Sequence, residues 1–193
     1  MMPGDALIPD PTKIDTGALT VNAPPEDIWP WLVQMGQGRG GLYSYDWLDR
    51  MFGFLDRPSA TEILPEFQQL AVGDKIRWGR EELTVEVLEP LRALVLFDQG
   101  HGMKWVWQFG LFPIDDQRTR LISRGTEWTP NTAPYWLFLR VSEPTAFIMT
   151  RRFLLGVKQR AEALRASEPS RSAAPRTAPM AGVGEPGGGA FSS

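Results

Sequence analysis

The central part of the chain alternates hydrophobic and polar residues with a period of two. Leu83, Val85 and Val87 share one side of such a segment, while Thr84 and Glu86 occupy the other. This period predicts β-strands with one buried face. Short turns between consecutive strands predict an antiparallel meander. The predicted strands are residues 16–22, 75–78, 83–88, 93–97, 104–111 and 118–128, with turns or loops at 79–82, 98–102 and 113–117.

Other regions show the helical spacing of three and four. Ile28, Trp31 and Met35 fall on one stripe, which predicts a helix that opens after Pro24 and bends at Pro30. Further helices are predicted over residues 44–52, as one turn within 63–70, and from Glu143 to about Ala166. The last of these carries an apolar stripe and reaches roughly 30 Å, which is enough to lie across a whole sheet.

Composition divides the chain into three parts. The 193 residues are 42% hydrophobic, which suits one domain with a substantial core. Residues 1–14 are rich in Pro and Asp and are expected to form an extended arm, and residues 15–166 form the domain. Residues 167–193 consist mainly of Ser, Ala, Pro and Gly, so they are expected to be a disordered tail.

Charge and composition exclude several classes of function. The chain has no Cys and one His, which argues against disulfides, a thiolate nucleophile or a zinc site, and no metal or other cofactor is expected. The net charge of −3 is spread without a basic stripe, so nucleic acid is not an expected partner. No signal peptide and no apolar run of spanning length is visible, and a cytoplasmic protein is expected.

Three segments carry a resemblance to a known superfamily. They are APPEDIWPWLVQMGQGRGGLYSYDWL, TRLISRG near 119–125 and EPTAFIMTRRFLLGVKQRAE near 143–162. Together with the order of the elements, they resemble a bacterial cyclase-like branch of the SRPBCC superfamily, over roughly residues 14–165. That superfamily includes START domains, pollen-allergen-like proteins and polyketide cyclases. The resemblance implies an α+β helix-grip fold, in which a curved antiparallel sheet wraps around a long C-terminal helix, with two short helices near the N-terminus.

The resemblance implies a binding cavity between the sheet and the C-terminal helix. Proteins of the superfamily bind lipids, sterols, polyketides and protein clients on this one scaffold, so the resemblance does not choose among these functions. It brings no catalytic motif that matches residues of this chain. A small, largely apolar ligand, either lipid-like or aromatic and polyketide-like, is the expected partner, and the sequence names no protein partner.

An aromatic stripe is the first candidate wall of this cavity. Trp105, Trp107 and Phe109 share one face of a predicted strand. They face a helix that carries the small residues Ala146, Thr150 and Ala161, together with Phe153. Small residues opposite large rings are typical of simple interdigitation in a core and also of a cavity wall. Trp31, on the first predicted helix, joins this candidate set.

The loop GQGRGG between the first two helices is the second candidate. It matches the glycine spacing of dinucleotide-binding loops, but it follows a helix and no strand–helix–strand unit surrounds it, which argues against that function. The loop is either a structural turn, or it directs Gln37 and Arg39 to the cavity mouth, where Arg39 would grip a ligand anion or carbonyl. Arg39 would otherwise pair with Asp46 or Asp49 on the surface.

Tyrosines and the last strand supply the remaining candidates. The hydroxyl groups of Tyr43 and Tyr45 either orient a ligand or belong to helix packing. Arg124 and Trp128 share one face of the last strand, and the sequence leaves open whether that face points inward. His101, in a loop, is expected to be solvated because no partner for catalysis is specified.

Three functions therefore remain open at the level of sequence. The protein binds a small apolar molecule, or it is a cyclase-like or dehydratase-like enzyme acting in the same cavity, or it is an interaction module with an open apolar groove. An enzyme would need an inward ionisable residue, for which the candidates are Arg39, Asp46, His101 and Arg124.

Overall fold

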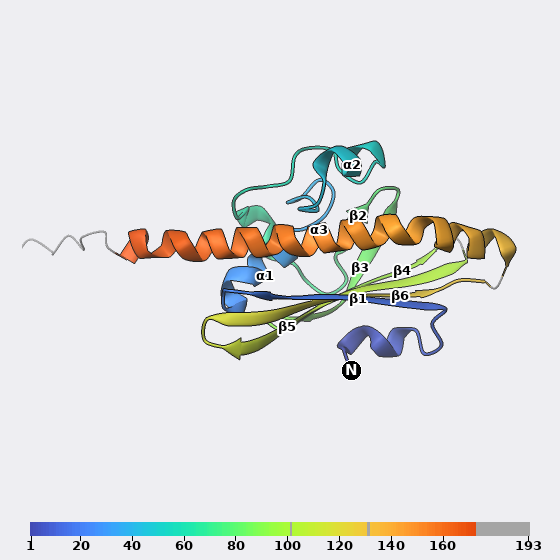
Figure 1. Ribbon diagram of the computed structural model, residues 1–193, viewed down its shortest axis with the longest axis horizontal. Helices are drawn as coiled ribbons and strands as arrows, with labels where there is room; N and C mark the ends of the chain where they lie inside the picture. The colour runs from blue at the N-terminus through green and yellow to red at the C-terminus, as the bar shows by residue number, and fades with distance from the viewer. Residues whose placement is uncertain (101, 131, 173–193) are drawn as a thin grey trace, which may run out of the picture.

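A computed structural model describes residues 1–100, 102–130 and 132–172 of the chain. Within them, a curved antiparallel sheet with the strand order β1-β6-β5-β4-β3-β2 grips one long helix, α3 (Figure 1). This is an α+β helix-grip fold, as the sequence predicts. The strands are β1 (Lys13–Val21), β2 (Lys75–Trp78), β3 (Glu81–Glu89), β4 (Ala93–Gly100), β5 (Met103–Asp115) and β6 (Arg118–Trp128). The helices are η1 (Pro3–Leu7), α1 (Pro25–Val33), α2 (Asp46–Met51), η2 (Pro65–Phe67) and α3 (Ala133–Ser172), of which η1 and η2 are 3₁₀ helices.

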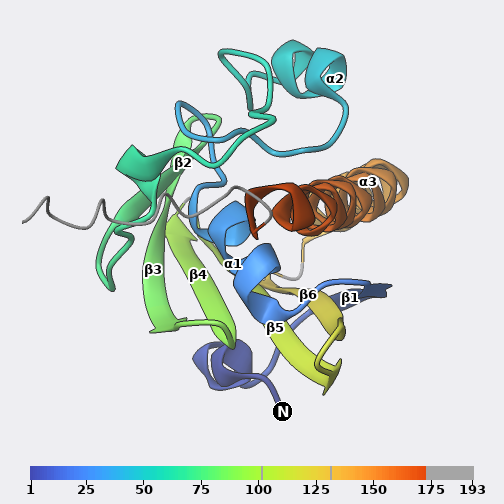
Figure 2. The same cartoon turned by 90° about the vertical axis from the view of Figure 1, so that its left-hand side faces the viewer.

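The concave face of the sheet carries the hydrophobic core. On this face Trp107 stands opposite Gly125, and Phe109 stands opposite Ser123, so the odd-numbered positions of β5 and β6 point inward. Leu94 and Leu96 of β4 continue the same buried surface. Helices α1 and α3 cover this face (Figure 2). The period-two alternation read in the sequence is therefore the alternation between the core side and the outer side of the sheet.

Helix α3 contacts the core mainly through its C-terminal half. Phe153, Val157 and Ala161 are fully buried or nearly so, whereas Phe147 and Ile148, nearer its N-terminus, are largely exposed. The helix is longer than the sequence predicts, because it begins at Ala133 rather than Glu143 and continues to Ser172. The prediction placed its start at the first strong start signal, Glu143-Pro144, but the helix runs through that proline.

Several strands are also longer than predicted. Strand β4 reaches Gly100 and pairs there with Met103, so most of the predicted 98–102 loop is strand. Strand β5 continues past Pro113 to Asp115, with an irregular register at that point that accommodates the missing N–H of proline. Glu81 and Glu82 belong to β3 and not to a turn. The ends of these strands project beyond the core and are rich in polar residues, as loops are. For this reason the sequence predicted loops or turns at these positions.

The first residues of the chain are not an extended arm. Residues Pro3–Leu7 form the 3₁₀ helix η1, which lies against the convex face of the sheet, on the side away from α3 (Figure 1). The carboxylate of Asp5 accepts a hydrogen bond from the backbone N–H of Met2, which closes the turn. Of the expected tail, residues 167–172 continue α3, and residues 173–193 lie outside the described residues.

Helix α3 approaches the rest of the domain very closely at Gly156. A Cβ atom built there would lie 2.0 Å from the backbone carbonyl oxygen of Tyr43. Because that oxygen belongs to the backbone, it has little freedom to move aside. Glycine at this position is therefore a condition for seating the helix.

We predict that Gly156→Ala lowers the free energy of unfolding by about 3 kcal/mol, since overpacking against backbone is costly. Urea titration followed by circular dichroism measures this loss. The control is Gln159→Ala, an exposed position on the same helix, which should change stability by less than about 0.5 kcal/mol. Equal stability of the two variants would show that α3 is not held at this approach.

Candidate functional site

A pocket of about 500 Å³ lies between α3, the sheet and the segment around α2. This volume is in the range of small-molecule sites. Its walls come from β1, β2, β5 and β6, from residues 145–153 of α3, and from α2 and the residues that flank it. The lining residues are Asp15, Leu42, Ser44, Asp49, Phe52, Phe54, Trp78, Trp105, Trp107, Gly125, Glu127, Thr145, Ala146, Met149, Thr150 and Phe153.

Aromatic rings form one continuous wall of the pocket. Trp105 and Trp107 stack with ring centroids 5.8 Å apart, and Trp78 meets Trp107 edge-on at 4.8 Å. Phe153 of α3 lies 5.4 Å from Trp107. The indole N–H of Trp107 donates to the hydroxyl of Ser123 at 3.0 Å, which fixes the orientation of this ring. The alternation along β5 places Trp105 and Trp107 side by side, and tertiary packing adds Trp78 of β2 and Phe153 of α3 to the same lining.

Small residues keep the space beside this wall open. Gly125 on β6 lies opposite Asp15 on β1, and a Cβ atom at Gly125 would lie 2.6 Å from a carboxylate oxygen of Asp15. The absent side chain therefore leaves room for the Asp15 carboxylate on the concave face. Across the pocket, α3 presents Ala146 and Thr150, which are too small to fill the volume.

Two acidic side chains on the sheet border the pocket. Burial raises the pKa of Asp15, an effect that Lys13 opposes and Glu143 reinforces. Burial likewise raises the pKa of Glu127, with Lys13 opposing and both Asp15 and Glu143 reinforcing. A carboxylate in an apolar wall is poorly solvated, so its charged form is disfavoured.

A third acid, Asp49 of α2, borders the pocket from the opposite side. It is completely buried, with 0% of its surface exposed. Ser44 Oγ donates a short hydrogen bond to Asp49 Oδ2, while Oδ1 has no hydrogen-bond partner among the described residues. Burial raises the pKa of Asp49, Ser44 opposes the shift, and the neighbouring Asp46 reinforces it.

Four of the residues predicted from sequence line the pocket: Trp105, Trp107, Thr150 and Phe153. Phe109 continues the aromatic row but is fully buried beneath it, in the core. Trp31 does not reach the pocket. It packs in the core against Tyr43 and borders a separate hollow of about 620 Å³, near the C-terminal half of α3.

The loop that contains Gln37 and Arg39 is structural. Gln37 donates to Asp56 at 2.7 Å. Arg39 donates to the carbonyl oxygen of Val33 at 2.9 Å and stacks over the ring of Phe67 at 4.6 Å. Neither side chain lines the pocket. The carboxylates of Asp46 and Asp49 instead accept hydrogen bonds from Ser59 and Ser44, and neither forms an ion pair with Arg39. The loop folds back so that the side chain of Arg39 lies over the C-terminal end of α1. The spacing of residues in the sequence does not predict this fold-back.

Tyr43 and Tyr45 also do not line the pocket. The hydroxyl of Tyr43 donates to the carbonyl oxygen of Trp31 at 3.0 Å, and the guanidinium of Arg160 lies 4.6 Å from its ring. Burial raises the pKa of Tyr43 well above its ordinary value. Tyr45 is exposed, with Arg152 over its ring at 5.6 Å. Both rings serve packing.

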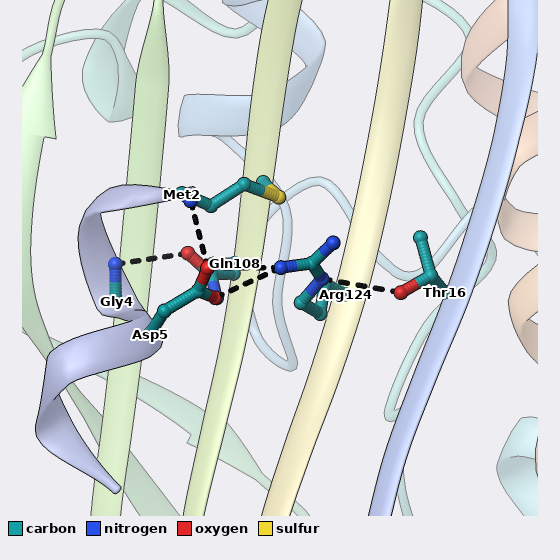
Figure 3. Close-up of polar contacts among 6 residues, drawn as sticks. All are labelled: Met2, Gly4, Asp5, Thr16, Gln108 and Arg124. Carbon is teal, nitrogen blue, oxygen red and sulfur yellow. Dashed lines mark hydrogen bonds and ion pairs between the residues drawn. The ribbon is translucent and has the colours of Figure 1, made fainter. Parts of the chain in front are cut away.

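Arg124 points away from the pocket, onto the convex face of the sheet (Figure 3). Its guanidinium contacts both carboxylate oxygens of Asp5 in η1, at 3.1 and 2.9 Å, and donates to Thr16. Gln108, opposite Arg124 in the sheet, donates to Asp5 and accepts from the backbone N–H of Gly4. The partner that sequence could not name is thus the N-terminal turn.

Of the last two candidates, Trp128 does not line the pocket. Trp128 is on the same face of β6 as Arg124 and is partly exposed. His101 lies outside the described residues.

Sequence reasoning missed Asp15, Asp49 and Glu127 as pocket residues. Glu127 has the same parity along β6 as Leu121 and Ser123, so the alternation itself marks it as inward once the register is known. Asp15 was lost because the first strand was predicted to begin at Thr16. For Asp49, only its helical neighbourhood was visible in the sequence, and its approach to the pocket depends on tertiary structure.

Comparison with known proteins returns structures but no sequence relatives. No family model matches the chain, and no curated protein matches it. The chain has the helix-grip fold. Solved structures similar to it include proteins of SRPBCC type, although each alignment has a TM-score below 0.5. The assignment of the fold therefore rests on the sheet order and on α3.

Three of these structures illustrate the range. An aromatase/cyclase from Streptomyces sp. R1128 is 18% identical, with 78% of this chain and 93% of that chain covered and a TM-score of 0.42. Norcoclaurine synthase from Thalictrum is 13% identical; the alignment covers 79% of this chain and 96% of that chain, with a TM-score of 0.43. The Aha1 dimer from Colwellia psychrerythraea is 17% identical; the alignment covers 76% of this chain and 94% of that chain, with a TM-score of 0.42.

In residues 1–100, 102–130 and 132–172, no helix has both the length and the apolar character needed to cross a bilayer.

We predict that Asp15→Asn and Glu127→Gln each raise the melting temperature at pH 7, by about 2–4 °C. Folding raises the pKa of both groups, so at neutral pH their ionised forms oppose folding and the amides do not. The gain in melting temperature should become smaller as the pH falls through the raised pKa values of the folded protein toward the ordinary pKa values of 3.8 for Asp and 4.5 for Glu. Differential scanning calorimetry across this range tests the sign, and a loss of stability at pH 7 would contradict it.

We predict the opposite for Asp5→Asn, which should lose about 1–3 kcal/mol of stability at pH 7. Burial alone would raise the pKa of Asp5, but hydrogen bonds from Met2, Arg124 and Gln108 outweigh it and lower the pKa. The loss of stability should therefore be complete at pH values above the ordinary pKa of 3.8. It should disappear as the pH falls through the lowered pKa of the folded protein. Urea titrations at several pH values measure it, with the exposed Asp10→Asn as the unaffected control.

Proposed function

We propose that the protein binds a small, largely apolar molecule in the pocket between the sheet and α3. The observation that carries this proposal is the aromatic wall of Trp78, Trp105, Trp107 and Phe153 beside an open volume of about 500 Å³. Well-packed cores leave few voids larger than a water molecule, so a hollow of this size with apolar walls is typical of a ligand site.

The way α3 is seated supports the same proposal. The C-terminal half of the helix is buried against the core, while its N-terminal half borders the pocket with Thr145, Ala146 and Met149. Phe52 and Phe54, which follow α2, close the opposite side, and Phe52 is partly exposed. These rings would cover an apolar ligand once it is bound.

An enzyme acting in the same pocket is the second candidate function. The observation in its favour is that three inward carboxylates, Asp15, Asp49 and Glu127, have raised pKa values, as general acids and bases often have. An activity would depend on one of these groups, and its amide variant would bind the ligand without turning it over. An interaction module with an open groove is supported less well, because walls from the sheet, from α3 and from the α2 segment surround the pocket.

We predict that Met149→Trp abolishes binding of the uncharged fluorescent probe N-phenyl-1-naphthylamine. The larger ring would occupy the pocket from the helix side, so the rise in probe fluorescence should fall at least about tenfold while the melting temperature stays within a few degrees. Phe147→Trp, at an exposed position of the same helix outside the pocket, is the matched control and should bind as the unchanged protein does. If both variants bind the probe equally well, the pocket is not the binding site.

A further inference from the structure

All of the charged side chains that line the pocket are acidic. They are Asp15 from β1, Glu127 from β6 and Asp49 from α2. The other polar side chains of the lining are the hydroxyls of Ser44, Thr145 and Thr150 and the indole N–H groups of the tryptophans. No Lys, Arg or His belongs to the lining within the described residues. Three separate elements therefore contribute charge of one sign to one apolar volume.

Asp49 shows that this acidity is not an ordinary solvated cluster. Its side chain is completely buried at the border of the pocket, and its Oδ1 atom lacks a hydrogen-bond partner in the part of the chain described. An unpartnered carboxylate oxygen in an apolar environment is costly to stability. The described residues provide no donor for this oxygen, so the missing donor is expected to come from what enters the pocket.

Asp15 and Glu127 are similarly placed on the sheet. Asp15 pairs across the strands with Gly125, and Glu127 pairs with Lys13, so the two acids are diagonal neighbours on the concave face. The charge of Lys13 acts on both acids, but Lys13 does not line the pocket and forms no ion pair with either of them. Glu143 at the side of α3 adds further negative charge. Both acids are half-buried and open to the pocket.

We propose that the ligand of this pocket is a cation, namely a protonated amine carried on an apolar or aromatic body. The inference rests on the proposed function and specifies its class of ligand. The ammonium group would donate to the carboxylates, with the accessible Asp15–Glu127 pair as its main counter-charge and Asp49 adding to the negative potential from the other side. The apolar body would lie against the tryptophan wall.

The aromatic wall favours a cation for a second reason. The faces of indole rings carry negative potential and attract ammonium groups, most strongly where water is excluded. Trp78, Trp105 and Trp107 meet within 5.8 Å of one another beside the acids. A fatty acid or another anionic lipid would instead meet three carboxylates without a compensating base, so anions are disfavoured in the same pocket.

Three probes that share one aromatic body and differ in charge test the proposal. They are 2-(1-naphthyl)ethylamine, 2-(1-naphthyl)ethanol and 1-naphthylacetic acid, titrated by calorimetry at pH 7 against the full chain. Hydrogen bonds to charged groups contribute about 1.5–3 kcal/mol. The dissociation constant of the amine should therefore be lower than that of the alcohol by a factor of about ten or more. The acid should bind most weakly. Equal affinities, or preference for the acid, would overturn the proposal.

Variants then locate the preference. The double variant Asp15→Asn with Glu127→Gln should bring the amine down to the affinity of the alcohol and leave alcohol binding unchanged. Asp49→Asn should reduce the preference for the amine in the same direction, and if this buried variant does not fold, the double variant carries the test. Glu66→Gln, an exposed acid outside the pocket, is the control and should retain the full preference.

The same titrations separate the two proposals. If the alcohol binds and the amine has no advantage, the pocket binds apolar molecules but the inference of a cationic ligand is wrong. If none of the three probes binds and N-phenyl-1-naphthylamine does not bind either, the proposed function itself fails. A preference for the amine that survives the double variant would also overturn the inference, because the charge would then be recognised elsewhere.

Discussion

The seating of one helix on a curved sheet determines the rest of this molecule. Helix α3 lies against the backbone of Tyr43 at Gly156, and Phe153, Val157 and Ala161 are buried on either side of this contact. Because a straight helix and a curved sheet cannot remain in contact along their whole length, the helix stands away from the sheet near its N-terminal half. Close contact at one end thus creates the hollow at the other, and the pocket is a geometric result of how the core is packed.

Chemistry is divided between the two faces of the sheet. On the convex face, charge is matched: Arg124 meets Asp5, and Gln108 completes their hydrogen bonds. Over the concave face, Asp15 and Glu127 of the sheet and Asp49 of α2 border an apolar space without a matching base among the described lining residues. The first arrangement stabilises the fold, whereas the second opposes it. A protein that retains costly, unmatched groups in one place commonly does so at a functional site.

The sequence predicted the architecture far better than the site. Alternation along β3, β5 and β6 and the apolar stripe of α3 define the sheet and its covering helix, since both patterns are direct consequences of burial. The aromatic wall of Trp105 and Trp107 follows from the same alternation. The alternation did not predict which face of the sheet carries Arg124. That choice depends on the pairing with the neighbouring strand, and a shift of one residue in this pairing moves every side chain to the other face. Asp49 and the path of Arg39 depend on how loops fold back in space, which no local pattern encodes.

The cluster of tryptophans has a spectroscopic consequence. Ring centroids of Trp78, Trp105 and Trp107 lie 4.8 to 5.8 Å apart, in a mixture of stacked and edge-on orientations. Indoles held this close and at fixed angles couple their electronic transitions, which splits their absorption into exciton bands of opposite rotational sign. The wall of the pocket is therefore a built-in chromophore assembly, whose optical activity depends on the angles between its rings and reports any small rotation of them.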